Sequence, residues 1–150
     1  KPIYIAAQSM YTDFPGAFES RSPMSIIGYD MTAAAAKEVY EKSGIGPEEV
    51  DVVELHDCFA HNELITYEGL GLCAEGEASR FIADGDNTYG GKFVVNPSGG
   101  LMSKGHPIGA TGAMRLTTLI NEMVRRDEKY GLETICGGGG QGICLIVERK

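Results

Sequence analysis

Basic residues are scarce in this sequence. Its 13 lysines and arginines stand against 21 aspartates and glutamates, which gives a net charge of −8. A surface that binds nucleic acid needs a basic stripe, yet the densest positive run is only Arg125, Arg126 and Lys129. A helix is predicted to end at these residues, where cations simply complement the helix dipole. The charge pattern therefore argues against nucleic acid as the main partner.

Long apolar runs and paired cysteines are also missing. No apolar run is long enough to span a bilayer, which takes about 20 residues. The four cysteines, Cys58, Cys73, Cys136 and Cys144, form no Cys-x-x-Cys pair and no regular framework. We therefore expect no membrane span, and free thiols in a reducing compartment. Cys73 and Cys144 are expected to be core or incidental residues.

The residues that are present have the composition of a globular domain, with 43% hydrophobic and 23% charged residues. β-rich runs predict strands at 2–7, 50–55, 93–96, 132–136 and 143–148. Helical spacing predicts helices at 33–42, from the turn at 56–59 to about 69, and at 110–130. The glycine-rich and polar stretches 11–29 and 76–91 predict two long loops. Strands that alternate with helices predict an α/β fold, a mixed β-sheet with helices on its faces.

Local signals sharpen two of these helices. Thr32 is predicted to cap the first helix and Gly44 to stop it. In the last helix, apolar residues at helical spacing predict the stripe that packs inward: Ala113, Leu116, Ile120 and Val124. The chain begins without Met and runs at once into a predicted strand, so we expect it to be a fragment.

Three unusual loops follow predicted strands directly, at 56–59, 96–112 and 136–142. In sheets of this kind, ligands and reacting groups gather at the carboxyl ends of the strands. The co-location predicts one functional site built from all three loops.

The loop at 105–112 places His106 between two glycines and next to Pro107, just before a predicted helix. The positive end of the helix dipole disfavours an imidazolium there, so we expect a neutral ring. Such a ring can donate to an oxyanion, and its other nitrogen can accept a proton from a thiol. The alternative is a loop histidine that caps the helix.

The loop at 136–142 places Cys136 at the end of a strand, before four glycines. Glycines let the backbone approach a substrate and offer N–H donors to an oxyanion. The thiol can serve as nucleophile or proton carrier, and the alternative is a buried strand cysteine beside a turn. The spacing Gly137-x-Gly139-x-x-Gly142 also fits a dinucleotide fingerprint, but a strand follows it where that fold needs a helix.

The loop at 56–59 holds His56 and Cys58, and His61 follows soon after. A His-x-Cys pair that ends a strand is often half-buried packing. A zinc site from His56, Cys58, His61 and another cysteine is conceivable, although the spacing fits no standard zinc signature.

Together, the three loops resemble the C-terminal domain of thiolases. The resemblance rests on His-Asp-Cys-Phe at 56–59, Gly-His-Pro-Ile-Gly-Ala-Thr-Gly at 105–112 and Cys-Gly-Gly at 136–138, in the same order. Asn-Thr-Tyr-Gly-Gly at 87–91 and Asn-Pro-Ser-Gly-Gly at 96–100 fit as well. The chain is most similar to the sterol-carrier-protein-2 or lipid-transfer-protein branch, in which His-Asp-Cys-Phe replaces an Asn-Glu-Ala-Phe loop. The resemblance covers essentially the whole chain and implies a thiolase-like half, a five-stranded mixed sheet with helices on its faces.

The resemblance implies CoA-dependent cleavage of a 3-oxoacyl-CoA, or the reverse condensation, through an acyl-cysteine. His106 would activate the nucleophilic thiol and help bind the thioester oxygen, and His56 would complete that oxyanion hole through a water. Cys136 would be the acid/base, and the Gly138 N–H would serve a second oxyanion hole. Some members of the branch lack the last cysteine and are thought to use the cysteine at the position of Cys58. This chain has both, so the base is ambiguous, and we favour Cys136.

The nucleophilic cysteine of the family lies in an N-terminal half that is absent here, so this chain alone is expected to be inactive. The family works as homodimers or tetramers. We expect acyl-CoA and coenzyme A as substrates, no tightly bound cofactor, no metal and no nucleic acid partner. The compartment is expected to be the bacterial cytoplasm, or the peroxisome if the chain is eukaryotic. Two alternatives stay open: a thiolase-fold aldolase subunit acting on steroid or acyl-CoA side chains, and a non-catalytic lipid carrier or scaffold.

Overall fold

A computed structural model describes residues 1–136 and 140–150, and within them the chain forms one mixed sheet. Its spatial order is β1-β5-β4-β2-β3. The antiparallel neighbours are β1 with β5 and β5 with β4, whereas β4, β2 and β3 run parallel. The strands are β1 (Ile3–Thr12), β2 (Val52–Glu54), β3 (Val94–Val95), β4 (Tyr130–Cys136) and β5 (Gln141–Arg149). The predicted five-stranded mixed sheet is confirmed.

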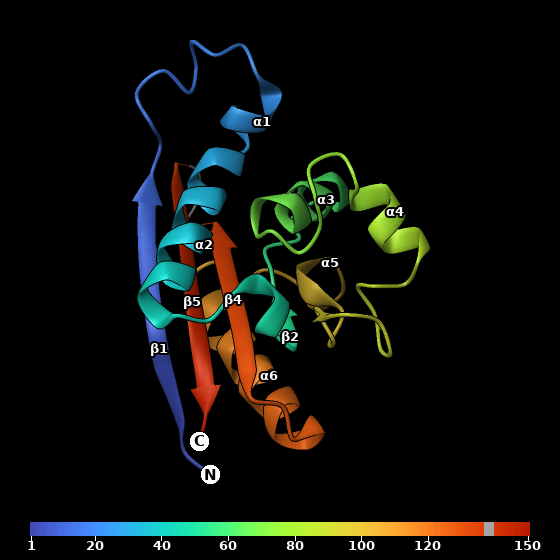
Figure 1. Cartoon of the computed structure of the whole chain (residues 1–150). Coiled ribbons are helices and arrows are strands. Elements are labelled where there is room, and N and C mark those ends of the chain that lie inside the picture. The colour runs from blue at the N-terminus through green and yellow to red at the C-terminus, as the bar shows by residue number, and fades with distance from the viewer. Residues whose placement is uncertain (137–139) are drawn as a thin grey trace.

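Helices lie on both faces of the sheet, with α2 on one face and α6 on the other (Figure 1). The remaining helices are short and lie in the connections. In chain order the helices are α1 (Pro23–Ile26), α2 (Tyr29–Ser43), the 3₁₀ turn η1 (Pro47–Glu49), α3 (Ala60–Gly69), α4 (Ala78–Ala83), α5 (Gly100–Lys104) and α6 (Thr111–Arg126).

The strands divide the core into two parts because successive side chains point to opposite faces. On the α2 side, Val39, Leu55 and Tyr67 belong to a large cluster of fully buried side chains. On the α6 side, Val52 packs with Leu119, Met123 and Val147. Each fully buried aliphatic side chain contributes roughly 1.5–3 kcal/mol, and together the two clusters fix the sheet edge from which the loops extend.

The limits of α2 are set by two glycines in the left-handed region, Gly28 at φ +94° and Gly44 at φ +71°. The predicted stop at Gly44 is confirmed, since its N–H donates to the Tyr40 carbonyl oxygen. The predicted cap at Thr32 is wrong. Its N–H already donates to the Gly28 carbonyl oxygen at 3.0 Å, inside the first turn.

Both predicted long loops contain regular structure. In the first, β1 continues to Thr12, which pairs with Gln141, and α1 follows. In the second, α4 forms because Ala78 and Phe81 enter the core. Their burial outweighs the weak helical signal of so polar a segment.

The predicted inner stripe of α6 is confirmed at Leu116, which packs against the cluster around Val52, and is wrong at Val124. The buried residues are Thr111, Arg115, Leu119 and Met123, whereas Val124 is 55% exposed. Hydrophobicity alone selects the neighbouring face because the buried face carries a guanidinium and a hydroxyl. The helix also ends at Arg126, before the predicted Tyr130, because Asp127 adopts φ +63° and Tyr130 begins β4.

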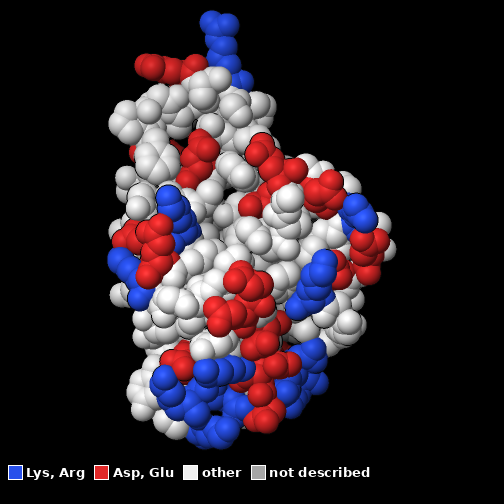
Figure 2. All heavy atoms as spheres, viewed as in Figure 1, with Lys and Arg blue, Asp and Glu red and all other residues white. Residues whose placement is uncertain are grey.

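Charged side chains of both signs mix at the end of the molecule that holds the termini (Figure 2). Lys129 and Lys150 both lie near Glu148, at 3.7 and 2.6 Å, and Arg149 pairs with Asp127. On the face shown, the cations near the termini are therefore interleaved with carboxylates.

Candidate active site

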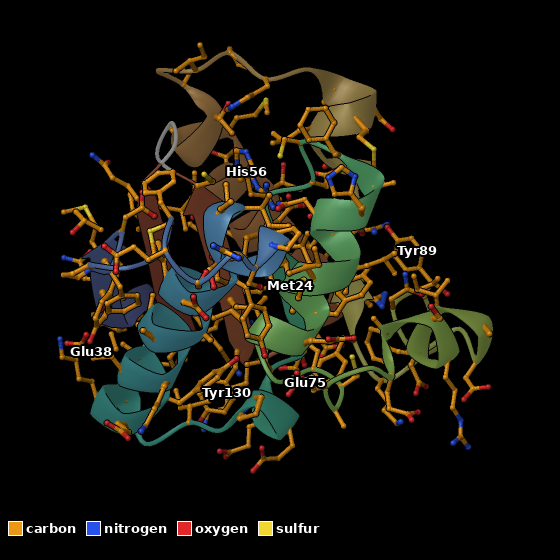
Figure 3. The ribbon with its side chains drawn as sticks, turned by 90° about the horizontal axis from the view of Figure 1, so that it is seen from above. Met24, Glu38, His56, Glu75, Tyr89 and Tyr130 are labelled. Atoms are coloured by element: carbon orange, nitrogen blue, oxygen red, sulfur yellow. The ribbon has the colours of Figure 1, made fainter. Side chains whose placement is uncertain are left out.

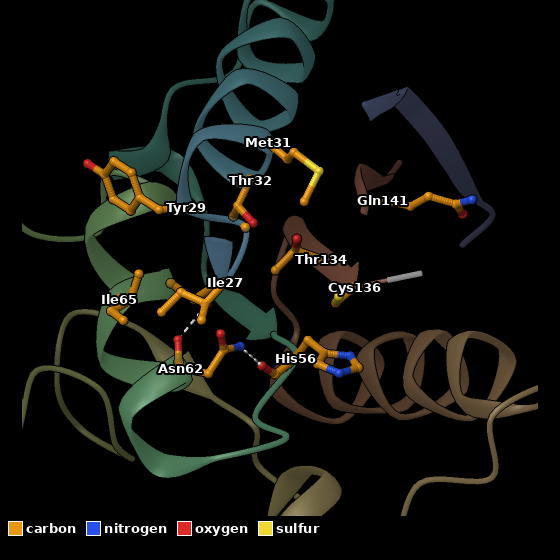
Figure 4. A pocket seen from close by; sticks show the side chains of 12 residues that line it. Ile27, Tyr29, Met31, Thr32, His56, Asn62, Ile65, Thr134, Cys136 and Gln141 are labelled. Atoms are coloured by element: carbon orange, nitrogen blue, oxygen red, sulfur yellow. Dashed lines mark hydrogen bonds between the residues drawn. The ribbon is translucent and has the colours of Figure 1, made fainter. Parts of the chain in front are cut away.

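The residues after β2, the segment between β3 and α6, and the last residue of β4 come together at the carboxyl ends of these strands. His56 follows β2, Cys136 ends β4, and His106 lies between α5 and α6. The His56 and His106 rings lie with their centroids 5.0 Å apart, nearly perpendicular at 84°. His56 and Cys136 line one cavity of about 20 Å³ (Figure 4), which is room for about one water. The structure thus brings together the three side chains that the sequence predicts.

His56 is buried at the inner end of this cluster, with 6% of its surface exposed. It lies well apart from Glu38, Glu75 and Tyr130 in the view from above (Figure 3). Its backbone carbonyl accepts a hydrogen bond of 2.7 Å from Asn62 Nδ2. Burial lowers the pKa of His56 to about 4, and the nearby charge of Arg115 acts in the same direction. The ring is therefore neutral at physiological pH and can donate an N–H without carrying charge.

His106 is exposed, and Thr111 holds its Nδ1. The Nδ1 atom lies 2.7 Å from Thr111 Oγ, and that hydroxyl donates its proton to the Pro107 carbonyl oxygen at 3.0 Å. A hydroxyl has one proton, so the ring must donate from Nδ1. The neutral imidazole then carries its lone pair on Nε2, the state that a base for a thiol requires.

Asp57 fixes the backbone next to His56. Its carboxylate accepts the N–H of Leu101 at 2.7 Å and that of Met102 at 3.4 Å, at the start of α5. Gly100 adopts φ +62°, and a Cβ at this position would collide with the Asp57 carboxylate. The glycine therefore lets the start of α5 pack closely against the loop after β2.

The two candidate acid/base thiols share a second pocket of about 220 Å³. Cys58 and Cys136 line it together with Ile26, Ile27 and Phe59 among other residues. Burial raises the pKa of the Cys58 thiol, and the neighbouring Cys136 raises it further. Both thiols therefore face the same space, and the geometry keeps both as candidates.

Sequence reasoning missed a buried polar cluster behind the site. Arg115 lies among Glu54, Asp57 and Glu133, and each of the four is at most 2% exposed. Burial raises the pKa of Glu54 and of Glu133 to about 7, against the effect of Arg115, which lowers both. A signal was present, because a charged residue inside an apolar strand run, such as Glu54, is rare without a partner.

One predicted site residue lies outside the residues that the structure describes: Gly138, the predicted oxyanion-hole donor. Within the described part of the chain, no three or more His, Cys, Asp or Glu side chains are arranged to hold a metal ion. None of the helices described there combines the length and hydrophobicity that a transmembrane span needs.

Comparisons with known proteins agree on one family. Residues 18–148 match the family described as thiolase C-terminal domain-like. Sterol carrier protein 2 of Rattus norvegicus is 59% identical over 119 residues, which make up 79% of this chain and 22% of that protein. The benzoylsuccinyl-CoA thiolase subunit BbsB of Thauera aromatica is 45% identical over 135 residues, 90% of this chain and 34% of that protein.

The fold has a match among solved structures in an Ltp2-ChsH2(DUF35) aldolase. The TM-score is 0.80 at 26% identity, and the match covers 99% of this chain and 40% of that one. This chain thus spans between 22% and 40% of the length of these relatives.

Proposed function

Because the chain belongs to the thiolase C-terminal domain-like family, we propose that it forms the proton-transfer half of an acyltransferase active site. The reaction is the CoA-dependent cleavage of a 3-oxoacyl-CoA, or the reverse condensation. Acyl-CoA and coenzyme A are the substrates, and no tightly bound cofactor takes part. The nucleophilic cysteine comes from a separate N-terminal half.

In cleavage, His106 Nε2 takes the proton of the nucleophilic thiol, and the thiolate attacks the 3-oxo carbon. The C2–C3 bond breaks, leaving an acyl-enzyme and the enolate of acetyl-CoA. His106 and His56, the latter through a water, stabilise the thioester oxygen of this enolate. The neutral state of the buried His56 suits this role, because a neutral donor needs no counter-charge in the pocket.

The Cys136 thiol then protonates C2 of the enolate and releases acetyl-CoA. Coenzyme A attacks the acyl-enzyme, its thiol proton passes to the Cys136 thiolate, and the imidazolium returns its proton to the nucleophile. The Gly138 N–H is proposed to bind the acyl-enzyme oxygen in this second step. The nucleophilic cysteine, His106 and Cys136 thus return to their starting protonation states.

One observation carries the proposal: the His56 and His106 imidazoles lie 5.0 Å apart, and His56 lines the same cavity as Cys136. We infer that proton acceptor, oxyanion donors and acid/base act together on one substrate, as a carbon–carbon cleavage through an enolate requires. Cys58 lines only the neighbouring pocket among those described, which supports Cys136 as the acid/base.

The partner half is proposed to cover the exposed side chain of Val124 on α6 and the loop that holds His106. Val124 on α6 is 55% exposed, and Ile108 beside His106 is 84% exposed. Burying such side chains against a second half would stabilise the pair. A homodimer or tetramer of the complete protein, in the bacterial cytoplasm or a peroxisome, is proposed with it.

The complete protein, incubated with acetoacetyl-CoA and free coenzyme A, is expected to form two acetyl-CoA per turnover. The His106→Asn variant is expected to lose roughly 100-fold or more in kcat, because general-base catalysis contributes that much. Absence of acetyl-CoA with the folded wild-type protein would contradict the proposal.

An aldolase is the second candidate, favoured by the match to the Ltp2-ChsH2(DUF35) aldolase over 99% of the chain. An aldolase would cleave a hydroxyacyl side chain without consuming coenzyme A, so the assay above separates the two. A non-catalytic lipid carrier is the third, suggested by the name of sterol carrier protein 2. It would bind lipid and turn over neither substrate.

A further inference from the structure

Arg115 reaches from α6 to three segments that build the site. Its Nη2 donates to Asn96 Oδ1 at 3.1 Å. Its Nε lies 3.5 Å from Glu54 Oε2, and its Nη1 lies 3.9 Å from Asp57 Oδ1. These partners belong to the end of β2, the loop after β2 and the loop after β3. One guanidinium therefore ties the helix that follows the His106 loop to the segments around His56.

The ties hold His56 from both sides along the chain. Asn96 Oδ1 also accepts the Leu55 N–H at 2.9 Å. Asp57, in turn, binds the start of α5 through the Leu101 N–H at 2.7 Å. Leu55 and Asp57 are the chain neighbours of His56. Arg115 lies directly beside Asp57, and it shares the acceptor Asn96 Oδ1 with the Leu55 N–H.

The surroundings of Arg115 make its charge hard to replace. Glu54 and Glu133 are register partners on the parallel strands β2 and β4, and both are buried at 2% exposure or less. With Asp57 they present three carboxyl groups to one guanidinium. A neutral side chain at position 115 would remove this cation, and any carboxylate of the cluster that stays ionised would be buried without the guanidinium beside it.

Resting on the proposed function, we propose that Arg115 is a positioning residue that sets the geometry between the His56 and His106 imidazoles. It acts through Asn96 and Asp57 and touches neither substrate nor reacting atoms. Removing one partner of a buried ion cluster is strongly destabilising, so kcat is compared per molecule of folded protein. A shift of about 1 Å in a catalytic group costs about 100-fold in rate, and this loss remains after the correction for folded protein.

The test uses the complete protein with three variants. Arg115→Met removes the charge and keeps the length, Arg115→Lys keeps the charge and loses the planar fork, and Arg125→Met is the control. Arg125 lies on the same helix, is 63% exposed and pairs with Glu122. Arg115→Met is expected to lower kcat for thiolysis about 100-fold while KM changes less than about threefold. Arg115→Lys is expected to recover about tenfold of that loss, and Arg125→Met to match the wild type.

A second readout follows the geometry directly. In protein with ¹³C-labelled histidine, the contact between the His56 and His106 ring protons is expected to weaken in Arg115→Met, with the circular dichroism spectrum retained. A lower melting temperature with unchanged kcat and ring contact would overturn the proposal. If Arg115→Met does not fold, wild-type kcat and ring contact in Arg115→Lys would overturn it instead. The ring contact needs no turnover, so a wild type without thiolysis contradicts the proposed function alone.

Discussion

At the scale of single residues, two contacts decide the state of the site: the Thr111 hydroxyl against His106 and the Asp57 carboxylate against the start of α5. The first contact fixes which nitrogen of His106 carries the proton. The second fixes the backbone that follows His56. Each of these two contacts predicts the effect of one substitution.

Thr111→Val removes the hydroxyl and keeps the shape of the side chain. His106 Nδ1 then loses the acceptor that holds its proton, and the imidazole is free to change tautomer. We expect kcat for thiolysis in the complete protein to fall at least about tenfold. Thr111→Ser keeps the hydroxyl and should retain most of the activity. Equal rates in the two variants would show that the hydroxyl does not orient the base.

Gly100→Ala places a methyl group against the Asp57 carboxylate, at a residue with φ +62°. Gly76→Ala is the matched control, because Gly76 has φ +82° and open space around it. The left-handed backbone alone costs roughly 1–2 kcal/mol, so the control should lose about that much. Gly100→Ala is expected to lose at least about 2 kcal/mol more, since a buried carboxylate must move. Urea denaturation measures both, and equal losses would contradict the contact.

At the scale of elements, the sequence predicts the strands well and the polar connections poorly. The β-rich runs around Val52 and Ile146 predict buried strands, and the three loops at strand ends predict the site. Helices α4 and α5 are too short and polar to show a periodic pattern. Helix α5 forms only because Asp57, distant in sequence, caps its first N–H groups. The hydrophobicity of α6 predicts the inward position of Leu116 but not that of Arg115, because a hydrophobic pattern places a charged side chain on the outer face.

The pairing of β2 with β4 also predicts a dependence of stability on pH. In the folded chain, burial raises the pKa of Glu133 to about 7, above its usual value near 4.3. The folded state thus binds the proton more tightly. The carboxyl group therefore costs no stability below about pH 4, and the wild type loses stability as the pH rises through about 7.

Glu133→Gln removes this pH-dependent loss of stability. Between pH 4 and pH 8, we expect the free energy of unfolding of the variant to rise relative to the wild type by on the order of 3 kcal/mol. Glu19→Gln, at an exposed position, should show no such gain. Urea denaturation at both pH values measures the difference. A pH-independent effect of Glu133→Gln would mean that the group is ionised in the fold.

At the scale of the whole molecule, we propose that the chain presents half of a site, with the exposed side chains of Val124 and Ile108 beside it. The proposed partner half explains why Val124 is exposed on a helix that otherwise packs against the sheet. Val124→Glu should therefore destabilise the complete protein, because burying an unpaired charge costs several kcal/mol.

The control is Ser79→Glu, which adds the same charge at an exposed position on α4. We expect the melting temperature of the complete protein to fall by several degrees for Val124→Glu only. Equal melting temperatures for the two variants would place the partner half elsewhere.

The most direct measurement follows the proton that Cys136 is proposed to move. In D₂O, the complete protein should exchange the methyl protons of acetyl-CoA for deuterium, which mass spectrometry detects. We predict that Cys136→Ala abolishes this exchange and that Cys58→Ala retains it, since both thiols line one pocket but Cys136 also lines the cavity of His56. Full exchange in Cys136→Ala, with loss only in Cys58→Ala, would contradict the assignment of Cys136 as the acid/base.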